Sequence, residues 1–287
     1  KLCHKFMFLS KYGLLIVAFW GMLLLSCTSH RHADPMTFWD RFDFTKIDIR
    51  KNEFSLEKLL VDFILSLDDV SSEEAAKALI HTMDAAKETP LAFQFFKDKF
   101  YERLYDPKST LRNDAYYGVV LDYLISSDMS SEADRSKYKA LLALVQRNLP
   151  GVEANNFSFE RSTGEKGDLH SLKGAYKLVF FYAPLCKACK STMPDLKAIH
   201  RLVQRTKKSK MTLLTVCATG RESDWLSYEA ELPAEWINGY NKEDEIIRNG
   251  LYDLKAFPTF YLIDENNKVL LKDADMERLV GYIGSLS

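Results

Sequence analysis

Two cysteines separated by two residues, Cys186-Lys187-Ala188-Cys189, carry the strongest chemical signal in the sequence. They follow the apolar stretch Tyr176–Tyr182 and precede a helical pattern. Residues three apart lie on one side of a helix's first turn, so the two sulfurs can form a small-ring disulfide. A helix N-terminus presents free N–H groups that stabilise a thiolate, which is the reactive form of cysteine. We therefore predict Cys186 as nucleophile, Cys189 as resolving thiol and Lys187 as a thiolate-stabilising charge.

A Cys-x-x-Cys pair is also compatible with half of a zinc site or with a purely structural disulfide. Zinc usually takes four ligands, and the sequence contains no second pair of this spacing. Cys217, His170 and His200 could complete a metal site only if the fold happened to bring them together. We predict no metal and no organic cofactor, since the disulfide itself is the redox group. Cys217 is expected to be a buried core thiol, and both histidines are expected at the surface.

The N-terminus has the pattern of a targeting segment. Lys1, Lys5 and Lys11 precede the apolar run Leu14–Leu25. This run is shorter than the about 20 residues needed to span a bilayer, and a basic start before a short apolar run is typical of a secretory signal. It ends in Leu24-Leu25-Ser26-Cys27, which resembles a bacterial lipobox. The resemblance implies cleavage after residue 26 and lipid on Cys27, which would tether the chain to a membrane.

Residues 27–150 are predicted to form a helical domain. Leucine, isoleucine and phenylalanine recur at helical spacing after Ser55, which is interpreted as an N-cap. Ser71 with Glu74 has the spacing of a capping box, and Thr89-Pro90 is typical of a cap followed by a first-turn proline. Further helices are expected over residues 113–125 and 131–147.

Residues 151–287 have a different pattern. Short β-rich runs at residues 176–182, 211–216 and 259–263 alternate with helical stretches, which predicts an α/β domain with a central mixed sheet. The length of 287 residues fits the two domains 27–150 and 151–287 behind the signal peptide 1–26. The net charge of −1 gives no support to nucleic-acid binding.

The C-terminal half resembles the thioredoxin fold, most closely the TlpA/ResA-like exported thiol–disulfide oxidoreductases. One motif is residues 181–189 with the Met193-Pro194-Asp195-Leu196 that follows; the other is residues 256–264, Ala-Phe-Pro-Thr-Phe-Tyr-Leu-Ile-Asp. The resemblance implies that Pro258 follows a cis peptide bond. It also implies that Phe257 and Pro258 face the cysteines and receive the substrate backbone.

The sequence departs from the family pattern at three positions. Leu185 replaces the tryptophan that usually precedes the first cysteine, so we expect Leu185 to contact substrate in its place. Thr192 and Phe180 stand where family members have acids that are thought to move protons at the buried thiol. These departures affect the expected rate and direction of exchange, and leave the thiol chemistry itself in place.

The stretch Phe38–Phe44 is similar to the start of a helical domain of unknown function found before thioredoxin domains in bacterial lipoproteins. We therefore predict a periplasm-facing lipoprotein of the bacterial envelope, in the outer membrane, that reduces or isomerises disulfides of exported proteins. An upstream thiol would supply its electrons. Two alternatives stay open: a binding or assembly lipoprotein whose helical domain does the work, and a thiol oxidant.

Overall fold

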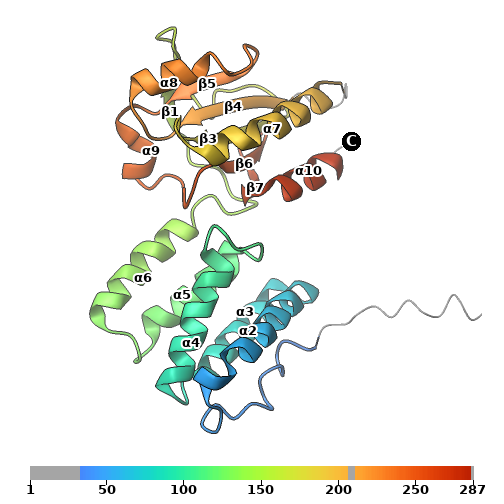
Figure 1. The fold of residues 1–287 in the computed structure, drawn as a ribbon, viewed down its shortest axis with the longest axis vertical. Helices are drawn as coiled ribbons and strands as arrows, with labels where there is room; N and C mark the ends of the chain where they lie inside the picture. The colour runs from blue at the N-terminus through green and yellow to red at the C-terminus, as the bar shows by residue number, and fades with distance from the viewer. Residues whose placement is uncertain (1–32, 206–210, 286–287) are drawn as a thin grey trace, which may run out of the picture.

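The computed structural model describes residues 33–205 and 211–285. The predicted signal peptide and Cys27 lie outside the described residues. The chain forms a helical region (residues 34–145) and a sheet region (residues 158–285), joined by a linker (residues 146–157). In Figure 1 the helical region lies below the sheet region, and the linker passes between them.

Buried apolar stripes at helical spacing build the helical region, and side-chain caps start most of its helices. Ser71 and Glu74 form the predicted capping box, and Thr89 caps a helix that begins at Pro90. A π-helical turn, Tyr101–Tyr105, follows that helix. The helices are α2 (Ile49–Ser66), α3 (Ser72–Ala86), α4 (Pro90–Phe100), α5 (Asp114–Ser126) and α6 (Glu132–Val145).

The predicted start of α2 was wrong. Asp48, not Ser55, is the N-cap, and its side chain accepts a hydrogen bond from the backbone N–H of Lys51. The first two turns of α2 are mostly exposed, with Phe54 84% exposed, so they lack the apolar periodicity from which a helix start is predicted.

Aromatic side chains fill the core of the helical region. Trp39 and Phe44, from turns that precede α2, are buried against Phe96 of α4 with ring centroids 5.0 and 5.3 Å away. Phe63 of α2 lies 5.8 Å from Trp39. The aromatic stretch at residues 38–44 is therefore largely part of the core rather than an open groove.

The sheet region contains one mixed sheet in the order β2-β1-β5-β4-β3-β6-β7. Strand β3 is parallel to β4 and antiparallel to β6, so the strand before the cysteines lies beside the strand after Pro258. The strands are β1 (Ser158–Glu160), β2 (Lys166–Asp168), β3 (Tyr176–Tyr182), β4 (Met211–Cys217), β5 (Ile237–Tyr240), β6 (Thr259–Asp264) and β7 (Val269–Ala274).

Alternate side chains of the central strands enter two separate apolar cores, as the pleat of a strand requires. On one face Leu178 and Phe180 contact a cluster that includes Leu196 and Leu279. On the other face Phe181 belongs to a second cluster. The helices are α7 (Lys187–Arg205), α8 (Glu222–Glu229), α9 (Glu245–Arg248) and α10 (Met276–Ser285), and α7 and α10 lie side by side over one face in Figure 1.

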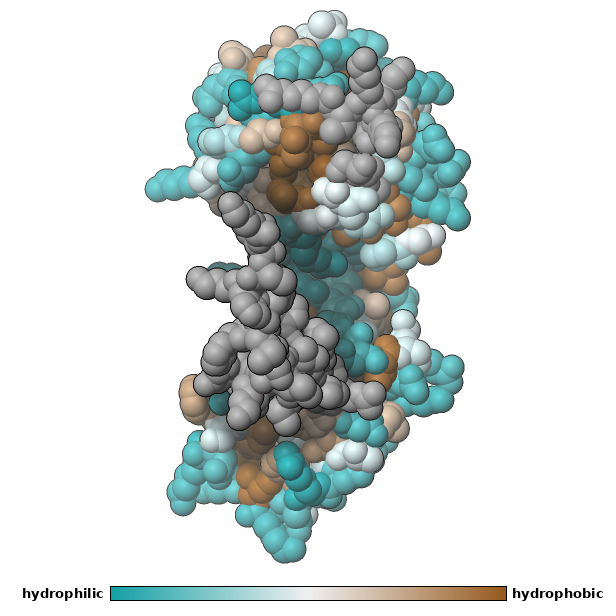
Figure 2. All heavy atoms as spheres, turned by 90° about the vertical axis from the view of Figure 1, so that its right-hand side faces the viewer, coloured by the Kyte–Doolittle hydropathy of each residue, from teal (hydrophilic) through white to brown (hydrophobic). Residues whose placement is uncertain are grey.

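The linker pairs with the edge strand β7 and the turn before it. Backbone hydrogen bonds join Gly151 N to Val269 O (2.8 Å), Val269 N to Val152 O (2.9 Å) and Ala154 N to Asn267 O (2.8 Å). On the face drawn in Figure 2, the surface narrows between the two regions and the visible side chains there are mostly hydrophilic.

The predicted fold class is confirmed: a helical region precedes a thioredoxin-like region with a mixed central sheet. Within residues 33–205 and 211–285, no helix has both the length and the apolar character that crossing a membrane requires.

Candidate functional site

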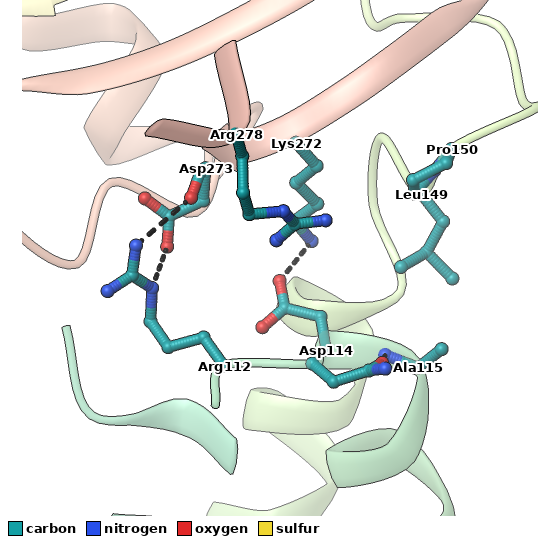
Figure 3. Close-up of a pocket in the computed structure, with 9 residues that line it drawn as sticks. Arg112, Asp114, Ala115, Leu149, Pro150, Lys272, Asp273 and Arg278 are labelled. Carbon is teal, nitrogen blue, oxygen red and sulfur yellow. Dashed lines mark hydrogen bonds and ion pairs between the residues drawn. The ribbon is translucent and has the colours of Figure 1, made fainter. Parts of the chain in front are cut away.

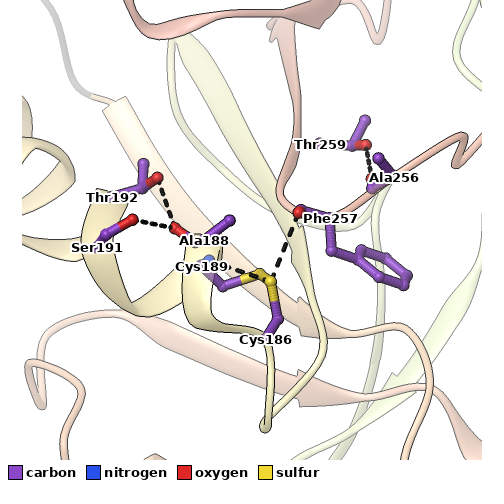
Figure 4. Close-up of a disulfide and its surroundings, with 8 residues drawn as sticks. All are labelled: Cys186, Ala188, Cys189, Ser191, Thr192, Ala256, Phe257 and Thr259. Carbon is purple, nitrogen blue, oxygen red and sulfur yellow. Dashed lines mark hydrogen bonds between the residues drawn. A yellow bond between two sulfur atoms is a disulfide. The ribbon is translucent and has the colours of Figure 1, made fainter. Parts of the chain in front are cut away.

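Cys186 and Cys189 form a disulfide at the start of α7, with Cα atoms 5.3 Å apart (Figure 4). Strand β3 ends at Tyr182, and a short turn then places Cys186 immediately before the helix. Cys186 is partly exposed, whereas Cys189 is fully buried one turn inside the helix. The pair thus has one sulfur that an incoming disulfide can reach and one that it cannot.

The start of α7 supplies the electrostatics at Cys186. The backbone N–H of Cys189 points at Cys186 Sγ, with a distance of 3.1 Å between N and Sγ. An N–H donor and the helix dipole both favour a thiolate at this position. Lys187 is exposed at the first residue of the helix, and the Lys190 ammonium lies 5.4 Å from the centre of the Tyr228 ring. The backbone therefore provides the closest stabilising contact to the sulfur.

The predicted cis-proline pair, which directly precedes β6, completes the site. The Phe257–Pro258 peptide bond is cis. The carbonyl oxygen of Phe257 lies 3.5 Å from Cys186 Sγ, as Figure 4 shows. Leu185 is 76% exposed beside the disulfide. The fold thus brings Leu185, Cys186, Phe257 and Pro258 to one place, although about seventy residues separate the two motifs.

A buried hydrogen-bond group lies in the strands around the site and was missed by sequence reasoning. Tyr182 donates to Asn238 Oδ1 (2.9 Å), and Thr215 Oγ1 donates to the same oxygen (3.0 Å). Burial raises the pKa of Tyr182, so its hydroxyl remains a donor. The three residues lie on three adjacent strands, and no local sequence pattern signals such a group.

Cys217 ends the central strand β4 and is a fully buried free thiol. Burial raises its pKa to about 12, so it stays protonated at neutral pH. The geometry agrees with the expectation of a core thiol.

The prediction that His200 lies at the surface was wrong. His200 is 5% exposed, and its Nδ1 accepts a hydrogen bond from Trp236 Nε1 (3.1 Å). Burial lowers its pKa, so the ring stays neutral. His170 instead lies near the surface, with Nε2 2.7 Å from the carbonyl oxygen of Ala154. Across the described parts of the chain, no three His, Cys, Asp or Glu side chains are grouped to hold a metal.

Comparison with known proteins covers both regions. The model of thioredoxin-like domains matches residues 174–269, and a domain of unknown function (DUF5106) matches residues 35–148. The chain is 26% identical over 153 residues to the thiol–disulfide oxidoreductase ResA of Bacillus cereus, covering 52% of this chain and 86% of ResA. The thioredoxin-like protein YneN of Bacillus subtilis is 27% identical over 119 residues, covering 42% of this chain and 68% of YneN.

A solved structure matches both regions together. The crystal structure of a thioredoxin-like protein from Bacteroides caccae superimposes with a TM-score of 0.82 and 33% identity, covering 88% of this chain and 91% of that one. This chain belongs to the thioredoxin-like family. As a member with ResA and YneN among its homologues, it is a thiol–disulfide oxidoreductase that carries a helical region before the thioredoxin-like fold.

Proposed function

We propose that Cys186 and Cys189 are the exchanging thiols and that their substrates are disulfides of exported proteins. One observation carries this proposal: the partly exposed Cys186 sulfur lies 3.1 Å from a helix N–H and 3.5 Å from the carbonyl oxygen beside a cis-proline. An extended substrate segment next to Phe257 and Pro258 would have its sulfur within reach of Cys186. Leu185, the residue before Cys186, offers an exposed apolar contact.

The reaction consists of two thiol–disulfide exchanges. The Cys186 thiolate attacks one substrate sulfur, forms a mixed disulfide and expels the other substrate sulfur as a thiolate, which takes a proton from water. The Cys189 thiolate then attacks Cys186 Sγ and releases the second substrate thiolate. Two electrons have passed to the substrate, and the Cys186–Cys189 disulfide remains. An upstream dithiol must reduce this disulfide before the next turnover.

The reaction needs no metal or organic cofactor, because the two sulfurs carry both electrons. We assign Lys187 a secondary role, since the Cys189 N–H is the nearer stabilising group. For isomerisation, the substrate would be released from the mixed disulfide by one of its own thiols before Cys189 attacks.

Sequence features support a place in the bacterial envelope. The lipobox-like Leu24-Leu25-Ser26-Cys27 supports lipid on Cys27 and so a membrane tether. We place the site facing the periplasm, at the outer membrane. In an oxidising compartment the disulfides of exported proteins persist, so a reductase or isomerase finds its substrates there. The two rival functions, an assembly lipoprotein and a thiol oxidant, make different predictions for the cysteine pair.

The test is the reduction potential of the pair, measured on residues 28–287 carrying Cys217→Ala in glutathione or dithiothreitol buffers. A value near about −270 mV supports a reductase, and one near about −180 mV supports an isomerase. A value near about −120 mV would favour the oxidant.

Cysteine variants separate the enzyme from the assembly protein. Cys186→Ser should abolish reduction of a fluorogenic peptide disulfide, and Cys189→Ser should trap the mixed disulfide with it. If Cys186→Ser keeps the activity of the unmodified chain, the proposed role of the pair is wrong.

A further inference from the structure

A cluster of buried charges lies where the helical region meets the sheet region. Asp114, the first residue of α5, faces two lysines of the sheet region: its Oδ1 lies 2.8 Å from Lys255 Nζ and its Oδ2 lies 2.7 Å from Lys272 Nζ. Both lysine side chains are only 3% exposed. Arg112 pairs with Asp273 across the same boundary (3.3 Å), as Figure 3 shows.

The Lys255 ammonium contacts three carboxylates and one aromatic ring, more than the single partner of a simple ion pair. Besides Asp114, its ammonium lies 3.2 Å from Asp273 and 3.4 Å from Asp253, and 4.7 Å from the centre of the Tyr105 ring. Burial alone would lower the pKa of Lys255, but these carboxylates outweigh burial and raise it, so the side chain is charged. Buried ion pairs often stabilise a fold no more than apolar residues would. We therefore interpret this cluster as one that fixes the position of Lys255 relative to the helical region.

The residues before Lys255 are held by hydrogen bonds from the linker and from the helical region. Arg147 of the linker donates to the carbonyl oxygen of Gly250 (2.6 Å), and Asn148 donates to that of Leu251 (2.8 Å). Tyr105, at the end of the π-helical turn, donates to Asp253 Oδ1 (3.1 Å). The segment at residues 249–255 is thus attached along its length to the helical region and the linker.

This segment leads directly into the active site. Lys255 is followed by Ala256, whose carbonyl oxygen accepts from Thr259 Oγ1 (2.6 Å), and then by Phe257, whose carbonyl oxygen lies 3.5 Å from Cys186 Sγ. Only Ala256 therefore separates Lys255, which is ion-paired with the helical region, from Phe257, whose carbonyl faces the reactive sulfur. A displacement of Lys255 must be absorbed within Ala256 and Phe257.

We propose that Lys255, held by Asp114, is a positioning residue for thiol–disulfide exchange, through which the helical region sets the place of Phe257 and Pro258 against Cys186. The inference rests on the proposed function of the cysteine pair. It gives the helical region a part in the reaction: it holds the surface on which a substrate segment docks, while the thioredoxin-like fold supplies the sulfurs.

Lys272 provides a matched control for Lys255. It is equally buried, contacts the same Asp114, and donates to the carbonyl oxygens of Val145 (2.7 Å) and Arg147 (2.8 Å) at the end of α6. Lys272 lies on β7, one strand away from the cis-proline, and not in the segment that leads to it. Lys255→Met and Lys272→Met should therefore both lower stability, but only the first should impair docking of substrate.

The experiment measures kcat/KM for a fluorogenic peptide disulfide, and separately the rate at which iodoacetamide alkylates reduced Cys186. Misplacing a docking group by about 1 Å can cost about a hundredfold, so we expect Lys255→Met to lower kcat/KM by about ten- to a hundredfold. Alkylation depends on the thiolate and not on docking, so it should stay within about twofold. Lys255→Arg should recover most of the lost activity.

Each outcome decides the proposal. Equal loss of kcat/KM in Lys255→Met and Lys272→Met, or full activity in a folded Lys255→Met, overturns it. If Lys255→Met does not fold, Asp114→Asn, which keeps the side chain's size, must show the same selective loss of peptide exchange. Failure of the proposed function looks different, because then the unmodified chain and Cys186→Ser would be equally inactive towards the peptide.

Discussion

The helical region and the sheet region treat buried polar groups in different ways. Within α2 and α3 of the helical region, buried hydroxyls bond to carbonyls of their own helix: Ser66 donates to Phe63 O (2.6 Å) and Thr82 to Ala78 O (2.8 Å). In the sheet region, buried polar side chains reach distant parts of the chain. Tyr182 bonds to Asn238 across 56 residues, and Trp236 to His200 across 36.

This difference shows which region has the relative positions of its elements fixed by polar bonds. Local hydroxyl bonds satisfy polar groups without fixing how helices sit against one another, so the helical region depends on apolar packing. Long-range polar bonds work only in one arrangement, because an unpaired buried group costs about 1–3 kcal/mol. The sheet region, which holds the reactive sulfurs, is specified in this second way, and so is the boundary between the regions.

The largest expected effect tests whether packing alone supports the helical region. Phe96→Ala removes a fully buried ring from its aromatic core and should lower the free energy of unfolding by about 3–5 kcal/mol. The potential of the Cys186–Cys189 pair should not change, since the ring contacts nothing in the sheet region's cores. Denaturant unfolding and redox titration measure the two effects, with the exposed Phe54→Ala as control. A changed potential in Phe96→Ala would contradict the division between the regions.

In the sheet region, buried His200 should make the free energy of unfolding depend on pH. Burial holds the pKa of His200 below its value of about 6.5 in the unfolded chain, with Glu235 opposing weakly. The unfolded state therefore binds the proton first, and stability present above about pH 6.5 is lost as the pH falls from there towards the folded pKa. One proton limits the slope to about 1.4 kcal/mol per pH unit.

Urea unfolding of the wild-type chain and His200→Gln at about pH 7.5 and pH 5 measures this contribution. The variant should lose less stability than the wild type across that interval. Equal losses in the two proteins would mean that His200 does not titrate on unfolding.

A smaller effect is expected at a helix end in the helical region. Ser71 accepts from the backbone N–H of Glu74 (3.2 Å), and Glu74 accepts in return from Ser71 N (3.0 Å). Ser71→Ala should lower the free energy of unfolding by about 1 kcal/mol. The neighbouring, exposed Ser72→Ala serves as the control and should change stability much less, so equal effects would show that the capping bonds contribute nothing.

The smallest expected effect concerns Cys217. Because burial raises its pKa to about 12, Cys217 should resist iodoacetamide in the native protein and react once urea unfolds the chain. Cys217→Ala should leave exchange with the peptide disulfide unchanged. Mass spectrometry of labelled peptides measures how fast Cys217 reacts with iodoacetamide in the native and the unfolded protein. Rapid labelling of Cys217 in the native protein would contradict this expectation and would show that β4 opens.

Much of the fold follows from local patterns in the sequence. Capping signals at Ser71 and Thr89 place two helix starts correctly, and the β-rich runs match β3, β4 and β6 to within a residue. The cysteine pair and the cis-proline motif are recognisable because each is a short, contiguous pattern.

Features made by distant residues could not be predicted in the same way. Asp114, Lys255 and Lys272 are ordinary surface residue types in sequence, and only the packing of two regions makes them a buried cluster. A weak signal existed in Lys272, which stands in an otherwise largely buried strand. His200 carried another: it lies four residues from Leu196 and three from Val203, on the apolar stripe of α7.

The linker's hydrogen bonds to the region of β7 have a consequence for the solubility of the molecule. Strand β7 is the last strand of the sheet, and an uncovered edge strand is a template for pairing with another chain. Residues 151–154 occupy part of that edge through the bonds to Val269 and Asn267. A shortened chain beginning at residue 158 would expose this edge, and it would be prone to aggregate strand against strand.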